Sequence, residues 1–135
     1  MKSFNEAINI DPNFAPAYFS KAYIYSVQDK SDLAIVNYRK SIEKYPQHSH
    51  SYNNLGLELL KSSKPDEALA MFKKALEMDP ANGDAHANLA YYYFDIEDYK
   101  NCWEHIHLAE QLKARIDPEF LKELEAKMPR INKSN

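Results

Sequence analysis

The sequence is poor in glycine, in cysteine and in long apolar runs. Its 135 residues include only two glycines, Gly56 and Gly83, against seven prolines. Scarce glycine, spaced proline and many Ala, Leu, Tyr, Lys and Glu residues favour helices joined by short turns over strands. The single cysteine, Cys102, excludes an intrachain disulfide framework. The length is sufficient for one domain with a continuous core.

Charge and hydropathy argue against two further classes of partner. Lys and Arg number 17 against 20 Asp and Glu, a formal net charge of −3. This balance lacks the clustered basic face of a nucleic-acid-binding protein, so we expect no nucleic-acid partner. No apolar run reaches the roughly 18 residues of a membrane span, and the first residues lack the apolar stretch of a signal peptide. The default expectation is therefore a cytoplasmic protein without membrane insertion.

The stretch from Tyr52 to Pro80 contains a pattern that recurs along the chain at a spacing of about 34 residues. Small residues recur within the expected helices, and larger apolar residues recur between them. The recurring sets are Ala22, Gly56 and Ala90, then Ala34, Ala68 and Cys102, and then Tyr38, Phe72 and Ile106. Glycine inside a helix costs about 1 kcal/mol relative to alanine, so Gly56 indicates a close approach of the paired helix. Cys102 takes the place of a small buried residue in this pattern.

The pattern resembles the tetratricopeptide repeat family, whose unit is a helix–turn–helix of about 34 residues. The resemblance covers nearly all of residues 1–128 as a single domain. It implies an all-α fold, a right-handed superhelical solenoid of antiparallel helix pairs. The expected parts are a half repeat at 1–14, full repeats at 15–48, 49–82 and 83–116, a capping helix at 117–128 and a flexible tail at 129–135.

Local signals predict where individual helices begin and end. Asp117 is a natural N-cap for the last helix, with Pro118 at its first position. In the first full repeat, Asp29 or Ser31 is available to cap the second helix. The second helix of the third repeat lacks the proline that ends its counterparts, so we expect it to continue toward Arg115.

The resemblance implies a non-catalytic protein–protein interaction module without a cofactor, because members of the family usually bind peptides or proteins in a concave groove. Asn54 and Asn88 could pair with a peptide backbone, and the aromatic residues suit apolar ligand side chains. Alternatively, the asparagines are merely solvated, and Phe19 and Tyr23 pack on a neighbouring helix. Helical geometry places on the groove face Phe19, Tyr23, His50, Asn53, Asn54, Leu57, Lys61, Asn88, Tyr91 and Asp95.

One subclass of the family binds the acidic C-terminal tails of chaperones through a clamp of lysines, arginine and asparagines. Of the matching positions, Asn54 is retained. Phe19 and Tyr23 replace the first-repeat lysine and asparagine, and Asp84 would face a carboxylate-rich tail without a compensating cation. The sequence therefore predicts against binding of chaperone tails.

The five histidines do not predict a metal site. His48 and His50 are close in sequence but lack a third ligand, and His105 and His107 point to different sides of their expected helix. No nucleophile elbow or phosphate-binding glycine loop occurs. We therefore expect no metal site and no catalytic residue.

A second functional hypothesis is a structural module that forms a dimer or part of a longer repeat array. Its basis is the apolar side of the first expected helix, which carries Phe4 and Ile8. An uncovered end of a repeat stack tends to self-associate. A concentration-dependent mass would favour this hypothesis over a groove-binding module.

Overall fold

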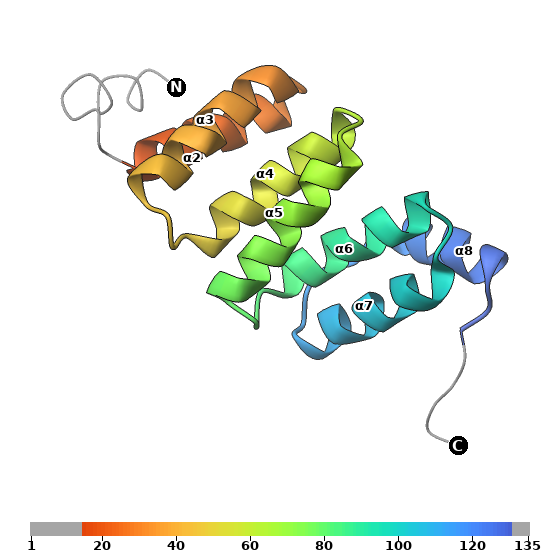
Figure 1. Cartoon of the computed structure of the whole chain (residues 1–135). Helices are drawn as coiled ribbons and strands as arrows, with labels where there is room; N and C mark the ends of the chain where they lie inside the picture. The colour runs from red at the N-terminus through yellow and green to blue at the C-terminus, as the bar shows by residue number, and fades with distance from the viewer. Residues whose placement is uncertain (1–14, 131–135) are drawn as a thin grey trace. The chain divides into compact units, whose positions relative to one another are not determined.

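The computed structural model describes residues 15–130, and this range contains α-helices and no strand (Figure 1). The expectation of an all-α fold is therefore confirmed. None of the helices in this range is both long and apolar enough to cross a membrane. The helices are α2 (Ala15–Val27), α3 (Ser31–Lys44), α4 (Ser49–Lys61), α5 (Pro65–Met78), α6 (Gly83–Asp95), α7 (Tyr99–Gln111) and α8 (Pro118–Lys127).

The helices form two compact units, one ending at Pro80 and the other beginning at Ala81. The single domain expected over residues 1–128 stays a prediction. Unit 1 contains α2 to α5, and unit 2 contains α6 to α8. The expected half repeat at 1–14, with Phe4 and Ile8, lies outside the described residues. The superhelical hand of the whole array stays a prediction.

Unit 1 consists of two helix pairs, α2 with α3 and α4 with α5, and α3 packs on α4. The recurring small residues lie where the paired helices meet: Ala22, Ala34 and Ala68 are each 0% exposed. Larger residues fill the space around them, because a single pair cannot bury both of its apolar faces. The largest buried apolar side chains of unit 1 are Tyr38, Leu55, Leu59 and Phe72.

Unit 2 consists of the pair α6 and α7, with α8 supplying part of its core. The fully buried residues are Ala90, Cys102, Ile106 and Leu124, so the last helix is anchored through Leu124. Asp117 caps α8, since its Oδ1 accepts the backbone N–H of Glu119 at 3.0 Å, and Pro118 is the first residue of that helix. Both features agree with the sequence signals.

Three turns are built on left-handed residues that follow the repeat spacing. Asp29, Ser63 and Glu97 have φ of 59°, 61° and 62°. In each turn the next N–H bonds the carbonyl five residues before it, as in Lys64 N to Leu59 O at 2.9 Å. This bond closes a Schellman turn, which usually has glycine at the left-handed position. The chain thus repeats a glycine-type turn without glycine.

These turns correct two sequence expectations. Asp29 belongs to the turn that ends α2, and α3 begins at Ser31 after an N-cap at Lys30, so neither Asp29 nor Ser31 is the cap. Helix α7 ends at Gln111 and does not reach Arg115. The reason is a further left-handed residue, Lys113 with φ 61°, which reverses the chain there.

Candidate functional site

Seven of the ten predicted groove residues lie on α2 and α4 in unit 1. The most exposed part of this face is on α2, where Tyr23 is 56% exposed and Val27, one turn later, is 68% exposed. On α4, His50 and Lys61 are exposed and Leu57 is half-buried. These four predicted side chains, together with Val27, are the surface that a ligand can reach, and the five are called the unit 1 face below.

Phe19 contributes to packing within unit 1. Its ring lies edge-on to the Tyr38 ring with centroids 5.7 Å apart, and edge-on to the His48 ring at 4.9 Å. The ring therefore joins α2 to α3 and to the start of α4. For Phe19 the packing alternative describes the structure better than an open groove residue.

Asn54 links α3 to α4. Its side chain forms a hydrogen bond with the Tyr38 hydroxyl, and its Oδ1 accepts from Asn53 Nδ2 at 3.3 Å. Burial raises the pKa of Tyr38 to about 12; the Asn54 bond opposes this shift, and Glu58 and Tyr23 add to it. Asn53 is only 2% exposed. The two asparagines thus form part of the contact between helices, and the buried side chain of Asn53 is not open to a ligand in this structure.

The remaining three predicted residues lie on α6 in unit 2. Asn88 is 7% exposed. Asp95 is an exposed residue, but partial burial of its carboxyl group raises its pKa. Tyr91 is half-buried: its ring lies edge-on to Phe120 of α8 at 4.6 Å, and its hydroxyl bonds the backbone of Asp117. Tyr23 and Tyr91 occupy equivalent repeat positions, but α8 packs on Tyr91 and Tyr23 stays exposed.

Glu58 on α4 is a residue that sequence reasoning missed. Its side chain is 1% exposed, and its Oε1 accepts the Ser26 hydroxyl of α2. Lys61 Nζ lies 3.6 Å from the same oxygen. Among the described residues, Oε2 has no hydrogen-bond partner. A sequence signal existed, because Ile24 and Tyr92 occupy the equivalent positions of the other two repeats.

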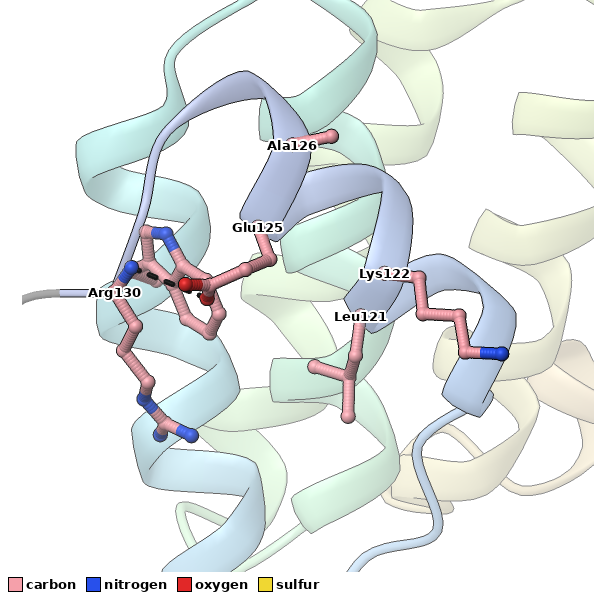
Figure 2. Close-up of a pocket in the computed structure, with 6 residues that line it drawn as sticks. Leu121, Lys122, Glu125, Ala126 and Arg130 are labelled. Carbon is pink, nitrogen blue, oxygen red and sulfur yellow. Dashed lines mark hydrogen bonds between the residues drawn. The ribbon is translucent and has the colours of Figure 1, made fainter.

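A pocket of about 520 Å³ lies on unit 2, and Leu121, Lys122 and Glu125 of α8 are among the residues that line it (Figure 2). Arg130 borders it: its guanidinium lies 4.8 Å from the Trp103 ring and pairs with Glu110, and its backbone N–H donates to Glu125 at 3.2 Å. Arg130 was expected in a flexible tail but is held by these contacts. Its charge is already compensated, so the pocket offers no evident ligand chemistry. The lining residues are Trp103, Leu121, Lys122, Glu125, Ala126 and Arg130.

Unit 2 also contains a histidine pair that the sequence analysis did not predict. His86 Nδ1 and His105 Nδ1 lie 3.1 Å apart, and the Tyr93 ring stacks on His105 at 5.3 Å. Burial lowers the pKa of His105, and the neighbouring His86 adds to the effect. Between residues 15 and 130, no cluster of three or more His, Cys, Asp or Glu side chains is arranged to hold a metal.

Cys102 has the properties of a buried structural thiol. Its Sγ donates to the Ala90 carbonyl at 3.1 Å, which ties α7 to α6. Burial raises the pKa of the thiol to about 12, and Asp98 adds to the shift. A thiol with so little thiolate character is a poor nucleophile.

Comparison with known families agrees with the repeats. One family profile, described as tetratricopeptide repeat, matches residues 50–82. A second profile with the same description matches residues 3–36 and 71–114. Together they reach all three full repeats.

Individual relatives and a solved structure are also similar to this chain. The chain is 36% identical over 127 residues to Hsp70-Hsp90 organizing protein 3 of Arabidopsis thaliana, covering 94% of this chain and 21% of that protein. It is 29% identical over 102 residues to anaphase-promoting complex subunit 3 of Schizosaccharomyces pombe, covering 76% of this chain and 15% of that protein. The chain thus spans less than a quarter of either relative. A crystal structure of MamA has the same fold, with a TM-score of 0.74, 16% identity, and coverage of 83% of this chain and 66% of that one.

Proposed function

Since the chain belongs to the tetratricopeptide repeat family, a family of protein-interaction modules, we propose that it binds a peptide or protein segment on the unit 1 face. The observation that carries the proposal is the exposure of Tyr23 and Val27 on α2, 56% and 68%. Repeat proteins of this kind use an extended concave surface for binding. Tyrosine is enriched among the side chains that dominate binding energy, because it supplies a large rigid ring with a polar end.

Half-buried Leu57 on α4 supports the same location, since it adds apolar surface at the repeat position equivalent to Tyr23. In unit 2 the equivalent Tyr91 is packed against Phe120 of α8. The ligand therefore engages Tyr23 and Leu57, and Tyr91 contributes to the stability of unit 2. Of the ten predicted residues, this assignment keeps Tyr23, His50, Leu57 and Lys61.

The names of several relatives describe proteins that act on other proteins. One is an Hsp70-Hsp90 organizing protein and another is a peroxisomal targeting signal receptor. These names support a protein or peptide partner for this chain. Chaperone tails stay an unfavoured ligand, because Phe19 and Tyr23 stand where the clamp of that subclass has a lysine and an asparagine.

The test is selection of binding peptides from a random library displayed on phage, followed by calorimetry with synthetic copies. Tyr23→Ala combined with Leu57→Ala is expected to weaken binding by about tenfold or more, because a truncated central aromatic commonly costs above 1 kcal/mol. The matched control is Leu33→Ala combined with Val36→Ala on α3, where the side chains are 45% and 49% exposed. The control is expected to bind like the wild type.

Circular dichroism of both variants checks that the helices are retained. If the α3 control loses binding and the Tyr23 and Leu57 variant keeps it, the unit 1 face is the wrong surface. If selection enriches no peptide, the proposal of peptide binding fails.

A further inference from the structure

The buried carboxylate of Glu58 is unusual because the fold does not need a charge at its position. Ile24 and Tyr92 occupy the equivalent positions in the first and third repeats, and Tyr92 is 8% exposed. An uncharged side chain therefore fits this place in the helix pair. Burying a carboxylate is unfavourable unless it is paired and hydrogen-bonded. Glu58 thus introduces a chemical group that packing alone does not explain.

The partners of Glu58 satisfy only one of its two oxygens. Oε1 accepts the Ser26 hydroxyl and lies 3.6 Å from Lys61 Nζ. Oε2 is buried and has no hydrogen-bond partner among residues 15–130. An ionised carboxylate can accept several hydrogen bonds, so the open capacity at Oε2 favours an additional donor.

Lys61 is a weak counter-ion for this carboxylate. Its Nζ is 3.6 Å from Oε1, longer than the roughly 2.7–2.9 Å of a charge-assisted hydrogen bond. Its side chain is 47% exposed, whereas that of Glu58 is 1% exposed. A long side chain that is half in solvent can move away at little cost in contacts, so Lys61 is a partner that another cation could replace.

The α2 residue that bonds Glu58 connects the carboxylate to the proposed binding face. Ser26 donates to Glu58, and Tyr23 lies three residues before Ser26 on α2, so both are on one side of that helix. Glu58 and Tyr23 both raise the pKa of the Tyr38 hydroxyl electrostatically, which agrees with this proximity. Tyr23 also exposes more than half of its surface. Aromatic faces attract ammonium and guanidinium groups, so the approach to Glu58 suits a cation.

We propose that Glu58 binds the side-chain cation of a lysine or arginine in the bound segment, which competes with Lys61 for the carboxylate. This inference rests on the proposed function and specifies its ligand as a basic peptide. The ligand ammonium or guanidinium donates to Oε2, while Ser26 keeps its bond to Oε1. Tyr23 lies over the aliphatic part of the ligand side chain.

The test uses the peptides selected on phage against the wild-type chain. The expected result is a lysine or arginine at a constant position of the enriched peptides. A synthetic peptide in which norleucine replaces that lysine, or citrulline that arginine, is expected to bind the wild type about tenfold or more weakly. This comparison needs no protein variant and therefore cannot fail through misfolding.

Two protein variants with opposite expected effects complete the test. Glu58→Gln keeps the shape and the acceptor for Ser26 but removes the charge. It is expected to weaken binding of the basic peptide and to leave the affinity for its neutral analogue unchanged. Lys61→Met removes the competing cation and is expected to tighten binding of the basic peptide. A purely structural role of Glu58 would affect the basic and neutral peptides equally.

Three outcomes would overturn the inference. Enriched peptides without a constant basic residue would reject the binding of a ligand cation by Glu58, while the proposal of peptide binding on the unit 1 face would stand. Equal affinities of the basic and neutral peptides for the wild type would do the same. Failure to enrich any peptide would reject the proposed function and this inference together.

Discussion

Phe72 of α5 lies directly against the α-carbon of Gly56 of α4. A Cβ added to Gly56 would come within 2.6 Å of Phe72 Cε1 and 2.7 Å of Cδ1. The Phe72 ring is 0% exposed, so it has little room to move away. The absence of a side chain at Gly56 is therefore what allows the second helix pair to close.

Gly56→Leu is expected to lower the free energy of unfolding of unit 1 by about 1–3 kcal/mol through overpacking. Gly56→Ala is expected to destabilise as well, although alanine is the better helix former by about 1 kcal/mol. Urea unfolding followed by circular dichroism measures both. In the double variant Gly56→Leu with Phe72→Leu, the smaller side chain at position 72 should recover part of the lost stability. An unchanged thermal midpoint of Gly56→Leu would contradict the steric explanation.

Ser63→Gly is expected to stabilise the turn between α4 and α5 by about 0.5–1 kcal/mol. Ser63 has φ 61°, a conformation that strains residues with a Cβ and that glycine adopts freely. Ser62→Gly is the matched control: Ser62 has φ −91°, so glycine there brings only its entropic cost. The midpoint temperature of thermal unfolding should rise for Ser63→Gly and fall for Ser62→Gly. Equal shifts in the two variants would show that the left-handed conformation is not what limits stability.

The Cys102 thiol is expected to resist labelling by a disulfide reagent at pH 8 while the protein is folded. Burial raises its pKa to about 12, so only about one thiol in 10⁴ is ionised at that pH. Unfolding in urea should restore the reactivity of an ordinary cysteine, measured by the absorbance of the released thiolate. Rapid labelling of the folded chain would contradict a closed contact between α6 and α7.

The stability of unit 2 is expected to fall as pH drops below 6.5. Burial and the charge of His86 lower the pKa of His105 from 6.5, so the unfolded chain takes up a proton that the folded unit accepts only at lower pH. The stability of unit 2 is thus fully present above pH 6.5, and part of it is lost as the pH falls from 6.5 through the lower pKa of His105 in the folded state. Fluorescence of Trp103, the single tryptophan, follows the unfolding of unit 2.

His105→Gln is expected to flatten this dependence on pH, and His107→Gln, at an exposed position of the same helix, is the control that should leave it unchanged. A dependence that survives in His105→Gln would assign the titration to other groups.

Much of the fold could be predicted from the spacing of small and apolar residues, because helix pairs require them at fixed positions. The burial of Ala22, Ala34, Ala68 and Cys102 follows from that spacing. The site was less predictable. Helical geometry placed Asn53 on the groove face, but Asn53 is 2% exposed, and α4 packs against both α3 and α5.

The sequence by itself determined the repeats, their register and the cap at Asp117, since these depend on local spacing and on hydrogen bonds within one turn. Only the tertiary structure decided which members of a repeated set stay exposed. Tyr23 and Tyr91 are equivalent in sequence, but Phe120 of α8 packs on Tyr91, whereas Tyr23 remains 56% exposed. The repeat alignment marks Glu58 as a charge in an uncharged column, but only the contact with Ser26 of α2 shows that its carboxylate is buried. Burial depends on neighbours that are distant in sequence, and a repeat pattern specifies positions without specifying what covers them.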